Sequence, residues 1–187
     1  MLLMSFFRQA CLVEGGLAIV AILAAPFVGI DYWTHCWCDG KTLQQTAWAI
    51  LPLVAGYCVL QMLPLTCLKQ IDQFVRTMYW QYMGHLTLGQ LAVIATLAGL
   101  GEEFFFRGLI QLGLSDVCGV GLAILLTSLL FGLAHAITLT YVILAFIISL
   151  YLGFLFDWTD NLFVPIAVHA LYDFFVFLFI RLTPQRT

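Results

Sequence analysis

The chain has 187 residues, of which 63% are hydrophobic and only 9% are charged. This composition lies far outside that of soluble globular domains and places the chain in a lipid bilayer. It predicts the bilayer as the main partner and no binding of nucleic acid. The formal net charge of -3 decides little, because the placement of charges matters more than their sum in a membrane protein.

Continuous apolar runs divide the chain into about six membrane-spanning helices. Four separate runs, each long enough to cross about 30 Å of hydrocarbon, lie near residues 11–30, 43–67, 88–113 and 161–181. Residues 117–156 add a run of 40 residues without Asp, Glu, Lys or Arg. As one helix this run would measure about 60 Å, so it must fold back. The predicted turn is HAITLT at residues 135–140, where Thr138 and Thr140 can bond local backbone groups.

These runs are continuous and do not alternate, which favours helices over a β-barrel. The sequence therefore predicts an all-α, polytopic membrane bundle in which residues 1–187 form a single domain. The first run is interpreted as a retained helix and not as a secretory signal. At about twenty residues it is longer than a typical signal core.

The stretch from Ile71 to Tyr82 has a different pattern, typical of an amphipathic helix. Its apolar positions follow helical spacing against a polar face that includes Asp72, Gln73, Arg76 and Gln81. We expect this helix to lie in the membrane interface. Basic residues then favour a cytoplasmic location for both termini. The cytoplasmic side receives Arg8, Lys69, Arg76, Arg181 and Arg186, and the other side receives Lys41 with five aspartates.

Six cysteines do not indicate a disulfide framework, because four of them lie in or beside apolar runs, where cysteine acts as a small buried hydrophobe. Cys36 and Cys38 differ. They occur with His35 in HCWCDG, in a loop assigned to the outer side. An ordinary loop, a disulfide and a metal contact are all compatible with this segment.

Ionisable side chains inside the spans are the strongest functional signal. Each costs about 2.5–3.5 kcal/mol at the centre of a spanning helix, so each marks a candidate site. These candidates are Glu102, Glu103, Arg107, His135, His169 and Asp173. Glu14 is assigned no role, because it lies near the N-terminal end of its helix, where the dipole favours a carboxylate.

The spacing of these residues predicts how they are arranged. Glu103 and Arg107 are four residues apart and can form an ion pair on one helical face, which leaves Glu102 about 100° away without a local cation. His169 and Asp173 share a face for the same reason. Because three segments each carry an acid or an imidazole, we expect them to converge on one wet pocket, although polar contacts that merely join helices are an alternative.

Three motifs give the chain a family resemblance. EEFFFR at 102–107, FGLAH at 131–135 and HALYD at 169–173 resemble, in order and spacing, the motifs of the CPBP intramembrane proteases. That family includes the Rce1-type CAAX prenyl endopeptidases and lysostaphin-resistance-like membrane proteins. The resemblance covers residues 88–180 and implies that they form the catalytic core.

The resemblance implies hydrolysis of peptide bonds in membrane-bound proteins or peptides, including CaaX-type lipidated substrates. Glu102 would be the general base that activates water, and Arg107 would hold Glu103. His135 would position the water or polarise the scissile carbonyl, and His169 with Asp173 would stabilise the oxyanion. The short chain is similar to bacterial members, which implies the bacterial inner membrane.

Two features leave alternatives open. Many relatives carry Asn at the position of Asp173, and an ionised Asp cannot donate a hydrogen bond to an oxyanion. Asp173 could instead orient His169, be protonated or bind metal. A zinc site would then use Glu102, His135, His169 and Asp173. In addition, the predicted spans put the site residues at unequal depths, so either the helices are tilted and unequal in length or some boundaries are wrong.

Two functions of another class also fit the composition of the site. The chain could be a non-catalytic membrane partner, such as an immunity or secretion-accessory protein. Intramembrane acids and histidines also build ion or proton relays, but the sequence lacks the inverted repeats and paired broken helices that many transporters show.

Overall fold

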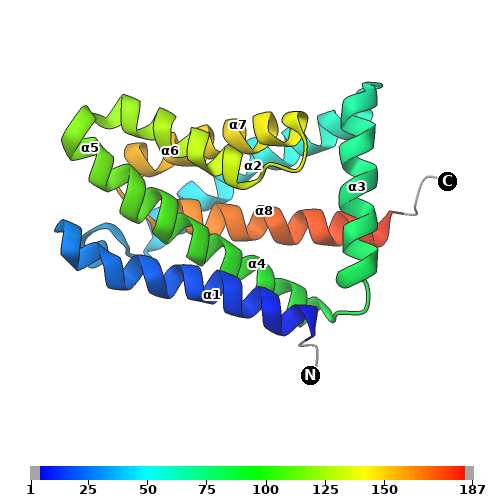
Figure 1. Cartoon of the computed structure of the whole chain (residues 1–187), viewed down its shortest axis with the longest axis horizontal. Coiled ribbons are helices and arrows are strands. Elements are labelled where there is room, and N and C mark those ends of the chain that lie inside the picture. Colours follow the sequence, from blue (N-terminus) through cyan, green and yellow to red (C-terminus); the bar gives the residue numbers. More distant parts are fainter. Residues whose placement is uncertain (1–4, 184–187) are drawn as a thin grey trace.

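The computed structural model describes residues 5–183, and this part of the chain is a bundle of helices (Figure 1). No strand occurs within the described range, so the predicted all-α fold is confirmed. The α-helices are α1 (Phe6–Ala24), α2 (Gly40–Met62), α3 (Thr66–Tyr82), α4 (Leu88–Glu103), α5 (Leu112–Cys118), α6 (Val120–Ala134), α7 (Leu139–Thr159) and α8 (Phe163–Leu182). Two 3₁₀ turns, η1 (Ala25–Val28) and η2 (Tyr32–His35), follow α1, and the π-helical segment η3 (Phe104–Gln111) joins α4 to α5.

The predicted spans correspond to helices, but not all of them have the expected length. Four helical segments are long and apolar enough to cross a membrane: Phe6–Val28, α2, α7 and α8. The predicted span at residues 88–113 is one continuous helical path through α4, η3 and α5. By contrast, α6 has only 15 residues, or about 22 Å, so it is shorter than the hydrocarbon layer.

The long charge-free run folds back where the sequence predicted. Helix α6 ends at Ala134 and α7 begins at Leu139. The Thr138 side chain caps α7 by accepting a 3.1 Å hydrogen bond from the backbone N–H of Tyr141. Thr140 lies in the first turn of α7 and not in the connection.

Helix α3 crosses one end of the bundle, where α1 begins and α8 ends (Figure 1). It contains the predicted amphipathic stretch and begins five residues earlier, at Thr66. Its polar face is not all turned away from the protein. Arg76 bonds Asp72 at 2.9 Å and its guanidinium lies 5.8 Å from the centre of the Phe179 ring of α8. Arg186, which the charge pattern assigns to this side, lies outside the described residues.

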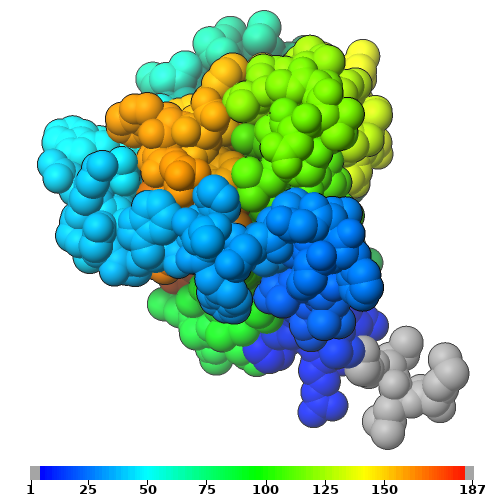
Figure 2. Space-filling view, turned by 90° about the vertical axis from the view of Figure 1, so that its left-hand side faces the viewer, coloured from blue at the N-terminus to red at the C-terminus, as the bar shows by residue number. Residues whose placement is uncertain are grey.

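The opposite end is closed by residues 25–40, which run across it from α1 to α2 (Figure 2). Tyr32 fixes this segment, because its buried hydroxyl donates to the carbonyl oxygens of Ala21 and Phe104, each at 3.1 Å. Burial raises the pKa of Tyr32 to about 12. His35 lies 2.8 Å from Asp160, and Cys36 and Cys38 are free thiols.

Helix α4 lies between α1 and α8 (Figure 1). Its contact with α8 depends on Gly99, where a Cβ would lie 2.8 Å from the carbonyl oxygen of Ile166 and 3.0 Å from the backbone nitrogen of Ala170. Both neighbouring atoms belong to the backbone and cannot turn away. The close approach of these two helices therefore requires glycine.

We predict that Gly99→Ala destabilises the protein by about 1–3 kcal/mol, because the added methyl group forces α4 away from α8. Thermal unfolding of the purified protein in detergent measures the effect. Gly56→Ala in α2 is the matched control, since nothing lies within 4 Å of a Cβ there. Equal unfolding temperatures for the two variants would contradict the role of Gly99.

Candidate active site

A buried ion pair forms the base of the site. The guanidinium of Arg107 donates to Glu103 at 3.0 Å, and both side chains are fully buried. The i,i+4 pair predicted from the sequence is therefore confirmed. Arg107 also donates to the hydroxyl of Ser149 at 2.8 Å and to its carbonyl oxygen at 2.9 Å, so the pair fastens the α4–η3 path to α7.

The π-helical geometry begins directly after Glu103 and includes Arg107. Widened helical turns of this kind free backbone carbonyls and are frequent at functional sites. The Phe104 carbonyl accepts the hydroxyl of Tyr32. The Arg107 guanidinium lies 5.0 Å from the centre of the Phe131 ring of α6, a favourable cation–π distance.

His169 of α8 is oriented by the same glutamate. Its Nδ1 lies 2.7 Å from Glu103 Oε1. Because Glu103 faces a permanent cation, Arg107, it is the ionised acceptor and the imidazole Nδ1–H is the donor. The Nε2 atom is thus left to face Glu102 Oε2 at 3.9 Å and Asp173 Oδ2 at 3.6 Å.

His135 has the same arrangement on a different helix. Its Nδ1 lies 2.8 Å from the carbonyl oxygen of Phe131, and a carbonyl only accepts, so Nδ1 carries the proton. The imidazole stacks on the Phe131 ring with centroids 4.4 Å apart. Its Nε2 then lies 3.7 Å from Glu102 Oε1.

Glu102 is the point at which these groups meet. One imidazole Nε2 faces each of its carboxylate oxygens, and its side chain is only 13% exposed. The Oε2 atom is buried and has no hydrogen-bond partner among the described residues. The structure thus brings together the six residues that the sequence singled out, from α4, η3, α8 and the end of α6.

The unequal depths expected from the sequence are explained by the length of α6. Because that helix has 15 residues, it ends before it would cross the hydrocarbon, and His135 immediately follows its last residue. His169 lies six residues into α8 and Glu102 lies near the end of α4. Both explanations left open therefore contribute, because the helices are unequal in length and the bounds of α1 and α2 differ by several residues from the expected ones.

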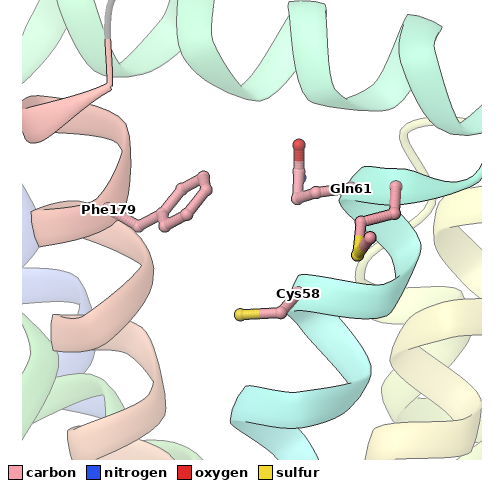
Figure 3. A pocket seen from close by; sticks show the side chains of 4 residues that line it. Cys58, Gln61 and Phe179 are labelled. Atoms are coloured by element: carbon pink, nitrogen blue, oxygen red, sulfur yellow. The ribbon is translucent and has the colours of Figure 1, made fainter.

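The cluster is reached through His135 and Asp173, whose side chains are 29% and 28% exposed. A separate hollow of about 490 Å³ lies between α2 and α8, lined by Cys58, Gln61, Met62 and Phe179. Figure 3 shows Phe179 facing Cys58 and Gln61 across it. None of the candidate site residues lines this hollow.

The donor set was also tested for zinc. Glu102, His135, His169 and Asp173 are suitable ligand types, but across residues 5–183 no three His, Cys, Asp or Glu side chains are arranged to hold a metal ion. His169 Nε2 and the facing carboxylate oxygens are 3.6–3.9 Å apart. The zinc site stays a prediction from the sequence, and the mechanism below contains no metal-dependent step.

Three contributors to the site were not found from the sequence. Ser149 is one of few polar residues in a long apolar run, which is a weak signal for its bond to Arg107. Phe131 lies in the FGLAH motif, but its carbonyl and ring contacts come from the fold. Glu14 was assigned no role, but its backbone packs against Gly101, next to Glu102.

The central part of the chain matches a known protein family. Residues 84–175 match the model of the type II CAAX prenyl endopeptidase Rce1-like family. This segment of the chain belongs to the Rce1-like family. The match includes Glu102, His135, His169 and Asp173 and confirms the resemblance found in the three motifs. Neither a curated protein nor a solved structure matches the chain.

The family and the helices together give a coarse identity. The Rce1-like family is a protease family, and four helices are long and apolar enough to span a bilayer. The chain is therefore an integral membrane protein, and its central segment is related to a family of hydrolases. Helices α1, α2 and α3 lie outside the matched segment.

We predict that Arg107→Met destabilises the protein by about 3–5 kcal/mol, because it leaves Glu103 as a buried charge without its cation. The double variant Glu103→Met, Arg107→Met should recover much of this loss, since no charge is then left unpaired. Thermal unfolding in detergent compares the two. If the double variant is as unstable as Arg107→Met, the ion pair does not explain the cost.

Proposed function

We propose that this protein is an intramembrane endopeptidase that hydrolyses peptide bonds of membrane-bound substrates, with Glu102 as the general base. One observation carries the proposal. The Nε2 atoms of two imidazoles from different helices face the two oxygens of the Glu102 carboxylate, and both Nδ1 atoms are held by fixed acceptors. Ion-pair packing alone would not require two oriented histidines.

In the proposed reaction, a water molecule lies between Glu102 and His135. Glu102 removes a proton from the water, and the oxygen attacks the scissile carbonyl carbon. The proton then passes from Glu102 to the departing amine as the C–N bond breaks, so the carboxylate is regenerated. A positioned carboxylate used in this way supplies typically 10²–10⁴-fold rate enhancement.

His169 would stabilise the negative charge that forms on the carbonyl oxygen. Because its Nδ1–H is engaged by Glu103, a donor at Nε2 requires the imidazolium form. The carboxylates of Glu102, Glu103 and Asp173 around the ring favour that form. Glu103 would act as a positioning residue, comparable in role to the carboxylate that orients the histidine in serine proteases.

The proposed substrates are proteins or peptides held in the bilayer, including CaaX-type lipidated chains. The family name supports this class, and the apolar surroundings of the site favour a substrate that is already in the membrane. The basic residues support a cytoplasmic location for both termini, in a bacterial inner membrane. Figure 1 agrees in one respect, because α1 begins and α8 ends at the same end of the bundle.

We predict that Glu102→Gln and His169→Ala each lower cleavage of a membrane-bound peptide at least about a hundredfold in liposomes. His85→Ala is the matched control, because His85 is an exposed residue outside the cluster. Fluorescence of a quenched peptide measures the rate, and thermal unfolding confirms that each variant is folded.

The same variants separate catalysis from a binding function. In cells, Glu102→Gln and His169→Ala should lose the phenotype that the wild-type gene restores to a deletion strain. If both variants support that phenotype fully, the protein acts as a non-catalytic membrane partner and the peptidase proposal fails.

We predict that Asp173→Asn keeps most of the cleavage activity, whereas Asp173→Leu lowers it about tenfold or more. The amide oxygen of asparagine keeps a polar group facing His169 Nε2, which lies 3.6 Å from Asp173 Oδ2, and leucine does not. A total loss in Asp173→Asn would show that the negative charge itself is required.

A further inference from the structure

Glu14 is an acidic residue in the membrane that the proposed reaction does not use. It lies eight residues beyond the start of α1, or about 12 Å into the helix. Its neighbours Leu12 and Val13 are 61% and 66% exposed, as expected for side chains that face lipid. Glu14 itself is partly buried, so α1 turns this carboxylate towards the bundle.

The backbone around Glu14 is packed directly against the site helix. A Cβ at Gly101 would overlap the carbonyl oxygen of Glu14 and lie 3.5 Å from its Cα. Gly101 immediately precedes Glu102, so α1 contacts α4 at the level of the proposed base. The height of Glu14 in the bundle is thus fixed by this contact.

The Glu14 side chain lies within the electrostatic field of the site. Its carboxylate interacts with those of Glu102 and Asp173 and with the imidazoles of His169 and His135. Among the described residues, no side chain forms an ion pair or a hydrogen bond with it. A carboxylate in a spanning helix without a cationic partner is costly to maintain.

The charges around the site do not balance. Glu103 is neutralised by Arg107, which leaves the carboxylates of Glu14, Glu102 and Asp173 against two imidazoles. With all three carboxylates ionised, the group would be negative even when both imidazoles are protonated. Burial and mutual repulsion disfavour that ionised state, so an ionised Glu14 requires a cation beside it. A bound cation would offset this excess in a medium of low dielectric constant.

Two further observations indicate that the cation belongs to a ligand. The Oε2 atom of Glu102 is buried and has no partner in the described part of the chain, so the site retains unused acceptor capacity. The cluster is also accessible, since the His135 and Asp173 side chains are more than a quarter exposed. Helix α1 lies outside the matched family segment, which suits a residue that selects substrates and does not perform the common chemistry.

We propose that Glu14 is a specificity-determining residue that binds a lysine or arginine side chain of the substrate close to the scissile bond. This inference rests on the proposed peptidase function and adds a substrate class to it: membrane-bound chains with a basic residue beside the cleavage point. Glu14 would then form the α1 side of the substrate site.

A binding experiment tests the assignment without requiring cleavage. The probes are two synthetic apolar helical peptides that are identical except for one central residue, lysine or norleucine. Fluorescence anisotropy with purified protein in nanodiscs gives the Kd of each. We expect the wild type to bind the lysine peptide about tenfold more tightly and Glu14→Gln to lose most of that preference. Asp157→Asn, which removes an exposed carboxylate at the end of α7, should keep it.

The outcomes distinguish failure of the Glu14 assignment from failure of the proposed peptidase function. The assignment of Glu14 is overturned if Glu14→Gln retains the lysine preference, or if the wild type shows none. It is also overturned if the variant lowers cleavage of both peptides equally, as loss of a proton carrier would. A lysine preference that depends on Glu14, found in a protein that cleaves neither peptide, would support the binding site and refute the peptidase. If charge is decisive, Glu14→Lys should instead prefer a peptide whose central residue is glutamate, measured by the same Kd comparison.

Discussion

The site depends on the ion pair between Glu103 and Arg107, which is fully removed from solvent. Two charges in such a place are stable only if each has its partners. Ser149 and His169 supply them, because the first accepts from Arg107 and the second donates to Glu103. The pair therefore links α4 and η3 to α7 and α8, and the orientation of a proposed catalytic imidazole follows from the same contacts that make the pair tolerable.

Adjacent glutamates on one helix divide these tasks because helical geometry separates their directions by about 100°. Glu103 is turned into the protein, where its Oε1 atom accepts from both Arg107 and His169. Glu102 is turned towards the end of α6, where one oxygen has no partner among the described residues. Glu103 has an arginine as its ion-pair partner, whereas Glu102 faces only two imidazoles, at 3.7 and 3.9 Å. This difference is the main physical argument for chemistry at Glu102.

Local spacing made part of this arrangement predictable from the sequence. The Glu103–Arg107 pair and the shared face of His169 and Asp173 follow from i,i+4 geometry, and the turn near Thr138 follows from a run too long for one helix. Contacts between segments that are distant in the sequence do not follow from local spacing and could not be predicted from it. The bond from Glu103 to His169 and the proximity of Glu14 to Glu102 depend on how helices pack. The π-helical segment also escaped prediction, because its free carbonyl is satisfied by Tyr32, a residue 72 positions away.

The short α6 has a physical consequence for the surroundings of the site. A helix of about 22 Å that starts at one membrane surface ends within the hydrocarbon, so residues 135–138 must place non-helical backbone there. Such backbone is stable in a membrane only where protein buries it or where it lines a water-filled space. The amide groups of His135, Ala136 and Ile137 bond nearby carbonyls, but the His135 side chain remains 29% exposed. The end of α6 therefore carries a partly exposed polar side chain next to Glu102, as the proposed hydrolysis would require.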